Sequence, residues 1–404
     1  MKISQRAQAI TPFLAMEFGK HAAALEAQGH RVIRLNLGEP DFGAPPAVRA
    51  ELQRQASEAA WPYTGALGLP ALREAIAGFY AQRHGVAIEP ERVVVTAGAS
   101  AALLLLTAAL VDPGDEVLVG DPSYPCNRRF LSGFGAQVRL VPTDEHSRFQ
   151  LDLAAVQRHW SARTRGLMIA TPSNPTGTSV PPAELAAICD WARAHGAWRI
   201  VDEIYLNLSD AQANGEPAPT VLAADPEACV INSFSKYFGM TGWRLGWAVV
   251  PQALVPAMER LAQNYYICAP TPAQMAALAC FTPETLAVCE ARKREFSERR
   301  ALVLQHLADM QLPVPVPPDG AFYVYIDVSP TGLDAMAFCQ RALHEAHVAL
   351  TPGHDFGMAD AARFVRLSYA AHRDDLTDGL VRLKRWLGSL GSPQGSGATS
   401  AHWT

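Results

Sequence analysis

The residues best suited to covalent chemistry in this chain lie around Lys236. Two serines, Ser233 and Ser235, precede this lysine, and Arg244 stands eight residues after it. The lysine amine can form a Schiff base with a carbonyl compound, while hydroxyls and a guanidinium are groups that bind a phosphate. A small molecule with both a carbonyl and a phosphate, such as pyridoxal phosphate, would suit all four side chains. Taken alone, however, a lysine behind two serines is also typical of an exposed loop.

The elements on either side predict where this stretch lies in the fold. Apolar runs at 228–231 and 245–250 predict a loop between two strands. Further strands are predicted at 93–96, 116–120, 137–141, 166–170 and 198–201, and helices at 70–84, 99–110 and 182–195. Near-continuous apolar strands separated by helices are typical of an α/β fold with a mostly parallel sheet covered on both faces. In such sheets the ligand lies beyond the carboxyl ends of the strands.

Gly98, Ala99 and Ser100 form the junction between a predicted strand and a predicted helix. A helix N-terminus offers free N–H groups and the positive end of the helix dipole, which suit an anion such as a phosphate. Ser100 adds a hydroxyl to these groups. A plain strand-to-helix turn is the alternative, and it is the commoner use of such a junction.

Asp202 and Asn174 lie just beyond two other predicted strands. A carboxylate among apolar residues needs a partner, and a protonated pyridine nitrogen would provide one for Asp202. Asn174, in the turn-rich stretch 171–177, could donate an amide hydrogen to a phenolate oxygen on the same ring. The alternatives are an aspartate that caps a turn and an ordinary loop asparagine.

Three further side chains complete the predicted site. Tyr124, between two prolines, could stack on a planar ring, and Tyr205 could reach the same ligand. Arg366, in the otherwise apolar stretch 364–367, could bind a carboxylate through two hydrogen bonds. The alternatives are packed aromatic rings and an outward-facing strand residue. Considered together, the loops supply an amine, a ring-nitrogen partner, phosphate donors and a stacking ring at one sheet edge, and Arg366 adds a carboxylate clamp.

The order of the elements predicts two domains, an arm and a tail. These units are an N-terminal arm at 1–45 that joins the smaller domain, a large domain at 46–290, a smaller α+β domain at 291–387 and a tail at 388–404. A long charged helix at 284–307 is predicted to bridge the two domains. The arm is expected to hold one amphipathic helix and a short strand at 32–37. The Gly/Ser-rich tail is predicted to be disordered.

Composition excludes several classes of protein. A 49% apolar chain with a net charge of -5 is an ordinary globular chain without a basic block for nucleic acid or an anionic membrane. No apolar run is long enough to span a bilayer, and the N-terminus lacks the apolar core of a signal peptide. The seven cysteines form no CxxC pair. We therefore expect reduced thiols, no metal site and a cytoplasmic location.

Several stretches, taken in order, carry a resemblance to a known family. They are NLGEPDF (36–42), YTGALGLPALREAIA (63–77), VVVTAGAS (93–100), GDEVLVGDPSYP (114–125), PSNPTG (172–177), VDEIY (201–205), SFSKYFGMTGWRLGW (233–247), GAFYVYIDV (320–328) and RFVRLSYA (363–370). Over residues 32–387 the chain resembles the class I/II aminotransferases (subgroup I-gamma) of the fold-type-I pyridoxal phosphate enzymes. The resemblance implies a mostly parallel seven-stranded sheet, pyridoxal 5'-phosphate as cofactor and a homodimer with shared active sites.

The matching positions imply a role for each site residue. The implied catalytic residues are Lys236, as Schiff base and proton shuttle, Asp202 and Tyr205. The implied cofactor-binding residues are Gly98, Ala99, Ser100, Tyr124, Asn174, Asp202, Tyr205, Ser233, Ser235, Lys236 and Arg244, with Tyr63 reaching the phosphate in the neighbouring subunit. The implied substrate-binding residues are Gly38, Asn174 and Arg366.

The implied activity is transfer of an amino group between an L-amino acid and a 2-oxo acid by a ping-pong mechanism. A lyase on the same fold, either a β-C–S lyase or an enzyme like aminocyclopropane-carboxylate synthase, is the alternative. The effector-binding half of a transcription regulator shares this fold as well. Only about 30 residues precede the first predicted strand, however, and they are too few and too weakly basic for a DNA-binding domain.

The identity of the amino acid is the least determined part of the prediction. Phe13, Met16 and Phe18 could line the substrate mouth, with packing in the core as the alternative. No matched residue would bind a second carboxylate, so aspartate is not predicted as a substrate. Arg128 and Arg129 could bind an acidic side chain, although solvent-exposed helix residues are the simpler interpretation.

Overall fold

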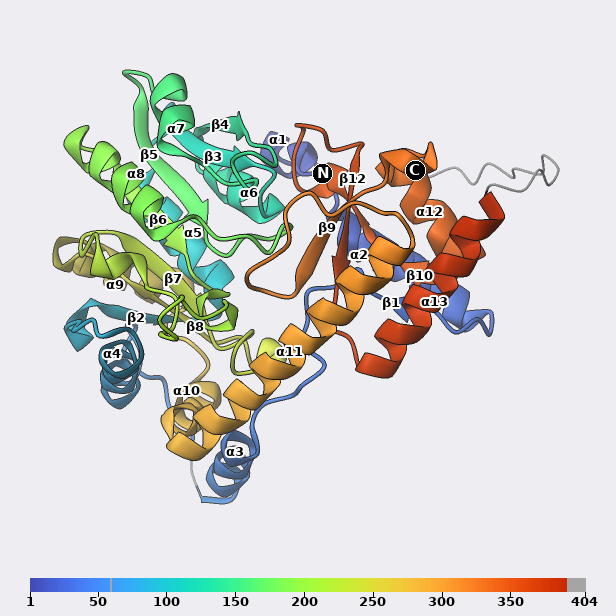
Figure 1. Cartoon of the computed structure of the whole chain (residues 1–404). Helices are drawn as coiled ribbons and strands as arrows, with labels where there is room; N and C mark the ends of the chain where they lie inside the picture. The colour runs from blue at the N-terminus through green and yellow to red at the C-terminus, as the bar shows by residue number, and fades with distance from the viewer. Residues whose placement is uncertain (59, 391–404) are drawn as a thin grey trace.

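The computed structural model describes residues 1–58 and 60–390 and contains a large central sheet of seven strands (Figure 1). Its strands are β2 (Val93–Thr96), β3 (Glu116–Asp121), β4 (Gln137–Pro142), β5 (Thr164–Ala170), β6 (Trp198–Asp202), β7 (Cys229–Ser233) and β8 (Gly246–Val249). Their order across the sheet is β2-β8-β7-β6-β5-β3-β4. The contacts of β8 with β2 and β7 are antiparallel and the other pairings are parallel. The predicted α/β fold with a mostly parallel sheet is confirmed.

The large sheet has apolar side chains on both faces, and helices cover each face. Val94 packs in one apolar cluster with Leu103 of α5 (Ala99–Leu110) and Met258 of α9 (Val255–Tyr265). Its neighbour Val95 packs in a second cluster with Ile76 of α4 (Pro70–His84). This second cluster also contains apolar residues of α8 (Pro182–Ala194). Successive side chains of a strand point to opposite faces, so helices on both faces require apolar residues at every position.

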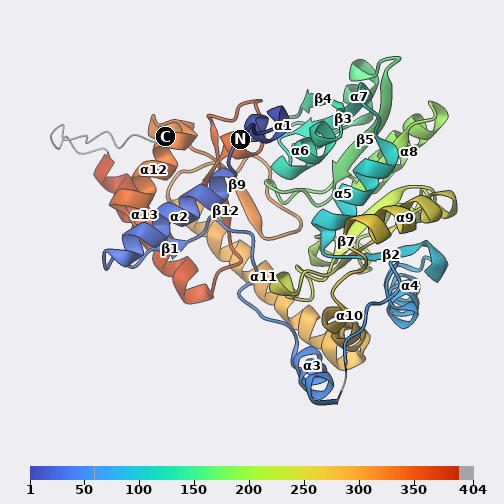
Figure 2. The same cartoon turned by 180° about the vertical axis from the view of Figure 1, so that it is seen from behind.

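Two smaller sheets lie beside the large one. Antiparallel strands β11 (Thr351–Pro352), β12 (Phe364–Ser368) and β9 (Tyr323–Asp327) form one, and β1 (Ile33–Arg34) pairs in parallel with β10 (Val348–Ala349) in the other. The helices of this part are α2 (Leu14–Ala27), α12 (Ala335–Glu345) and α13 (Arg373–Leu390). The long helix α11 (Pro283–Asp309) runs from α3 (Pro46–Glu58) and α10 (Thr271–Ala277) to these sheets, as both views show (Figure 2).

Local sequence signals place some helix ends well and others poorly. Helix α4 begins at Pro70 and ends before Gly85, which has a φ of 65°, as predicted. The single N-terminal helix that was predicted is instead two helices, α1 (Gln5–Ala9) and α2, with Pro12 in the break. Helices α6 (Pro125–Gly133), α7 (Leu153–His159) and α10 were not predicted as elements. Helix α13 extends to Leu390, into the stretch predicted to be disordered, and the rest of that stretch lies outside the described residues.

Two kinds of feature are absent from the described residues. None of the described helices is both long enough and apolar enough to cross a membrane. No group of three His, Cys, Asp or Glu side chains in the described part of the chain could hold a metal ion.

Candidate active site

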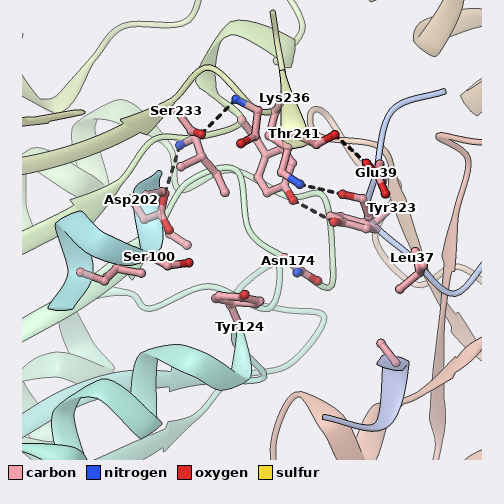
Figure 3. Close-up of a pocket in the computed structure, with 18 of the residues that line it drawn as sticks. Leu37, Glu39, Ser100, Tyr124, Asn174, Asp202, Ser233, Lys236, Thr241 and Tyr323 are labelled. Atoms are coloured by element: carbon pink, nitrogen blue, oxygen red, sulfur yellow. Dashed lines mark hydrogen bonds between the residues drawn. The ribbon is translucent and has the colours of Figure 1, made fainter. Parts of the chain in front are cut away.

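A cavity of about 410 Å³ lies where the carboxyl ends of the large sheet face the three-stranded sheet (Figure 3). Its walls come from the N-terminal segment, the loops of the large sheet, and strands β9 and β12. Among its lining residues are Gly38, Ala99, Ser100, Tyr124, Asn174, Asp202, Tyr205, Ser233, Ser235, Lys236, Arg244 and Arg366. The structure therefore brings together almost all of the residues selected from the sequence. Gly98 adjoins the cavity without lining it, and Tyr63 lies elsewhere.

Lys236 lies in the loop after β7, and its side chain lines the cavity. Its Nζ donates a hydrogen bond of 2.6 Å to the carbonyl oxygen of Gly38. Burial lowers the pKa of the amine to about 8, although the nearby carboxylate of Glu39 acts in the opposite direction. An amine with this pKa is partly neutral near physiological pH. It can therefore act as a nucleophile or as a base without a large cost of deprotonation.

Asp202 ends β6 and is only 4% exposed. Among the described residues, its carboxylate accepts one hydrogen bond, from the N–H of Ile204 at 3.1 Å. Burial raises its pKa to about 7, and the opposing effect of Lys236 is smaller. A buried carboxylate with so few partners is costly unless a cation faces it. A protonated ring nitrogen would fit this position, and the pairing of Asp202 with such a nitrogen stays a prediction.

The first turn of α5 and the loops around Ser235 form the end of the cavity suited to a phosphate. Helix α5 begins at Ala99, so the N–H groups of its first turn have no partners within the helix. Gly98 has a φ of 86°, and a Cβ there would lie 2.6 Å from Nη2 of Arg244. Glycine therefore leaves room for the guanidinium. The Oγ of Ser233 is used within the loop, because it accepts from the Ser235 N–H and donates to a carbonyl oxygen.

Arg366 is buried in β12 with 2% exposure, so the alternative of an outward-facing residue is wrong. Its guanidinium donates to Oδ1 of Asn174 at 2.8 Å and to the carbonyl oxygen of Asn36. It also lies 4.8 Å from the centre of the Phe356 ring. The Nε of Arg366 has no hydrogen-bond partner among the described residues. The guanidinium as a whole forms no ion pair with a described carboxylate. A buried cation in this state fits an incoming carboxylate.

The side chains of Asn174 and Tyr205 each form one hydrogen bond with a neighbouring side chain. Because the Asn174 oxygen accepts from Arg366, its amide hydrogens stay available to the cavity. The hydroxyl of Tyr205 lies 2.8 Å from that of Tyr323, a cavity residue to which the sequence assigned no role. The stretch 320–328 was recognised as a family match, and that match is the signal that could have found Tyr323.

Part of the cavity wall is apolar. Phe13, Met16 and Leu37 line it, and the Phe13 ring packs edge-on against Tyr124 with centroids 6.2 Å apart. Phe18 is fully buried in the core instead, which is the alternative that the sequence left open. Sequence reasoning also missed the cavity residues Leu37, Glu39 and Thr241, of which Thr241 donates to Glu39 at 2.6 Å.

Three residues considered from the sequence do not reach this cavity. Arg128 donates to the carbonyl oxygen of Asp355 at 2.9 Å and Arg129 donates to Thr11, so neither is directed at the cavity. Tyr63 is 78% exposed and does not line the cavity of its own chain.

Comparisons with known proteins agree with this geometry. The model of the family "Aminotransferase class I and II" matches residues 30–382. A valine–pyruvate aminotransferase of Mycobacterium tuberculosis is 40% identical, over 94% of this chain and 97% of that protein. An aspartate/prephenate aminotransferase of Thermus thermophilus is 35% identical, over 96% of this chain and 99% of that protein.

A solved structure of an aminotransferase from Mycobacterium tuberculosis superposes with a TM-score of 0.91 at 39% identity, covering 96% of this chain and all of that one. Relatives at this identity over nearly the full length support an aminotransferase rather than a lyase on the same fold. The chain therefore belongs to the class I and II aminotransferases, enzymes that use pyridoxal 5'-phosphate to move amino groups between amino acids and 2-oxo acids.

Proposed function

We propose that this aminotransferase takes L-amino acids with apolar side chains and passes their amino group to a 2-oxo acid such as pyruvate, by a ping-pong mechanism with Lys236 as the covalent anchor of the cofactor. The observation that carries this proposal is that the cavity is lined both by a buried arginine without a carboxylate partner among the described residues and by an apolar wall. Arg366 suits the carboxylate that every amino acid has, and Phe13, Met16 and Leu37 suit an apolar side chain.

The cofactor supplies a carbonyl that condenses with amines and a ring that accepts the electron pair left when a substrate loses its α-proton. Lys236 would take up and return that proton at its Nζ, whose pKa burial lowers to about 8. Asp202 would hold the ring nitrogen in its protonated form. Asn174 and Tyr205 would hold the phenolic oxygen, and Tyr124 would contact the ring.

The phosphate would be held where α5 begins at the cavity. The first N–H groups of α5, from Ala99 and Ser100, and the positive end of the helix dipole would bind it there. Ser235 and Arg244 add a hydroxyl and a guanidinium. Ser233 and Gly98 contribute indirectly, since Ser233 braces the loop and Gly98 leaves room for Arg244.

The substrate carboxylate is received by Arg366, with Asn174 and the backbone of Gly38 beside it. Apart from Lys236, the basic side chains that line the cavity are Arg366 and Arg244, and Arg244 is committed to the phosphate. The cavity thus offers no further cation for a second carboxylate among the described residues. An apolar amino acid as substrate agrees with the name of the valine–pyruvate relative, which is 40% identical. The Thermus relative, whose name includes aspartate, is 35% identical.

We further propose a division into a large domain at 46–290 and a small domain at 291–387, joined by the arm at 1–45. The pairing of β1 with β10 supports the place of the arm. We propose a homodimer in which Tyr63 reaches the phosphate of the neighbouring subunit, supported by its exposure outside its own cavity. A cytoplasmic location is supported by seven cysteines that are all free thiols.

A half-reaction screen tests the proposed substrate class. Each L-amino acid is mixed with the holoenzyme, the cofactor spectrum is followed by stopped flow, and the product is quantified. We expect valine, leucine and methionine to give one equivalent of 2-oxo acid per site, and aspartate and glutamate to react far more slowly. Fastest reaction with aspartate would contradict the proposed substrate. Release of pyruvate together with ammonia or a thiol, without an acceptor, would contradict the transfer itself.

A further inference from the structure

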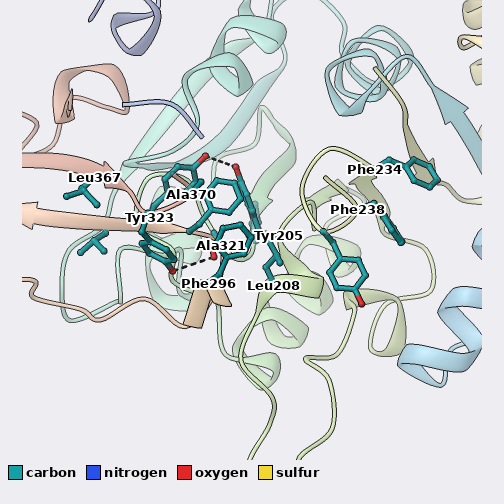
Figure 4. Packing of buried hydrophobic residues seen from close by; sticks show 14 of the residues in the cluster. Tyr205, Leu208, Phe234, Phe238, Phe296, Ala321, Tyr323, Leu367 and Ala370 are labelled. Carbon is teal, nitrogen blue, oxygen red and sulfur yellow. Dashed lines mark hydrogen bonds between the residues drawn. The ribbon is translucent and has the colours of Figure 1, made fainter. Parts of the chain in front are cut away.

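Tyr323 touches both halves of the proposed site although sequence analysis gave it no role. It lies in β9 of the three-stranded sheet with 1% exposure, and its hydroxyl lies 2.8 Å from that of Tyr205, which follows β6 of the large sheet. Figure 4 shows the two tyrosines in the aromatic core between the sheets. The hydrogen bond therefore connects the two sheets at the cavity.

The surroundings of Tyr323 fix its ring in place. The guanidinium of Arg366 lies 4.6 Å from the centre of the ring. At the hydroxyl end of the ring, a Cβ built on Gly38 would fall 1.7 Å from the Tyr323 hydroxyl oxygen, so only glycine permits this approach. Tyr323 thus lies close to both groups proposed to receive the substrate carboxylate, and its hydroxyl is within hydrogen-bond distance of that of Tyr205.

Either hydroxyl of the pair can be the donor, and the choice decides where the other proton points. Each tyrosine hydroxyl has one hydrogen to donate. Burial raises the pKa of both Tyr205 and Tyr323, so both hydroxyls keep their protons. Among the described residues, Tyr205 is the only hydrogen-bond partner of the Tyr323 hydroxyl. If Tyr323 donates, the Tyr205 oxygen is the acceptor and the Tyr205 hydrogen remains for the cavity.

We propose that Tyr323 is a positioning residue that donates to the Tyr205 hydroxyl and thereby directs the proton of Tyr205 to the phenolic oxygen of the cofactor. This inference rests on the proposed contact between Tyr205 and the cofactor. A hydroxyl that accepts a hydrogen bond becomes a stronger donor. Tyr323 therefore strengthens the stabilisation of the phenolate by Tyr205, without touching the cofactor itself.

The test is a spectroscopic pH titration of the holoenzyme without substrate, in which the visible band of the cofactor on Lys236 reports the proton shared with the phenolic oxygen. In Tyr323→Phe, a less stabilised phenolate holds that proton to higher pH. We expect the midpoint to rise by about half a pH unit to one unit, the effect of one ordinary hydrogen bond. We expect a larger rise in Tyr205→Phe, which loses the direct donor.

Tyr325→Phe is the matched control. Tyr325 lies two residues along the same strand, is equally buried, and has a hydroxyl with no hydrogen-bond partner among the described residues. Its removal should leave the midpoint unchanged. Thermal unfolding of the three variants verifies that each is folded.

The double variant Tyr205→Phe/Tyr323→Phe decides whether Tyr323 acts through Tyr205. We expect its midpoint to equal that of Tyr205→Phe, because the second change then has nothing to act on. Additive shifts would overturn the inference. So would an unchanged midpoint in Tyr323→Phe while Tyr205→Phe shifts, an outcome that leaves the proposed function standing. If neither single variant shifts, the proposed contact between Tyr205 and the cofactor is itself wrong.

Discussion

At the scale of single residues, burial adjusts the two main ionisable groups of the site in opposite directions. It lowers the pKa of the Lys236 amine to about 8 and raises that of the Asp202 carboxyl to about 7. Each group therefore titrates near physiological pH, and neither forms an ion pair with a described side chain of opposite charge. Such a cavity favours a ligand that has a carbonyl group for Lys236 and a positively charged ring nitrogen for Asp202.

The pKa of Lys236 predicts how the cofactor-free protein takes up pyridoxal phosphate. Only the neutral amine attacks a carbonyl, so the rate should rise about tenfold per pH unit below pH 8 and level off above it. Stopped-flow absorbance measures this rate. The same reaction of free pyridoxal phosphate with a small primary amine corrects for the ionisations of the cofactor. A rate that continues to rise up to pH 10 would mean that Lys236 has the pKa of an ordinary exposed lysine.

The residues that sequence could place and those that it missed differ in how the fold positions them. Asp202, Asn174 and Lys236 directly follow strands of one parallel sheet, and the carboxyl-end rule places such loops together. Tyr323 reaches the cavity only because the three-stranded sheet packs opposite those loops. Strand alternation gives its face, but nothing local in the sequence tells which partner that face will meet.

At the scale of elements, helix α2 is held by a distant residue. The residue before its first turn, Phe13, cannot cap it, and Asp355 accepts from the N–H groups of Leu14 and Ala15 at 2.9 and 3.0 Å instead. The first turn of α2 supplies the cavity residues Ala15 and Met16. Asp355, a buried carboxylate about 340 residues away in sequence, therefore positions the helix turn that supplies part of the apolar wall of the cavity.

We predict that Asp355→Ala loosens this wall and weakens selection for long side chains. The ratio of kcat/KM for leucine to that for alanine should fall about 2- to 30-fold, corresponding to the usual 0.5–2 kcal/mol of a helix cap. Steady-state kinetics with the two amino acids measures this ratio. The ratio also cancels any effect of the Asp355 charge on carboxylate binding at Arg366, because both substrates have that carboxylate.

Asp334→Ala is the matched control for this prediction. Asp334 caps α12 by accepting from the N–H of Ala337 at 2.7 Å, and it does not line the cavity. Its loss should lower the melting temperature without changing the leucine-to-alanine ratio. An Asp355→Ala enzyme that keeps the wild-type ratio would show that the cap serves stability alone.

At the scale of the whole molecule, the class of the fold was easier to predict than the contacts between segments that are far apart in the sequence. Periodic apolar patterns are local, and they gave the central sheet and long helices such as α4 and α11 close to their observed bounds. The strand predicted at 32–37 is confined to Ile33–Arg34, because its length depends on pairing with Val348–Ala349. Such pairing between distant segments leaves no local signal, and the same limit applies to any contact between two chains.

The proposed sharing of sites between two subunits can be tested by mixing two variants that are each defective in cofactor binding. Lys236→Ala cannot anchor the cofactor, and Tyr63→Ala should bind it about 10- to 100-fold more weakly through loss of a hydrogen bond to a charged group. In a dimer of one copy of each, the chain with Lys236 would receive Tyr63 from its partner, giving one intact site. After dissociation and reassociation, at a cofactor concentration that saturates wild-type sites but leaves Tyr63→Ala sites mostly empty, random pairing should restore about a quarter of the wild-type absorbance. Mixing Lys236→Ala with Asp202→Asn should restore no intact site, because both residues belong to the cavity of one chain. Absence of recovery in the first mixture, with dimers present by light scattering, would show that Tyr63 does not act across the interface.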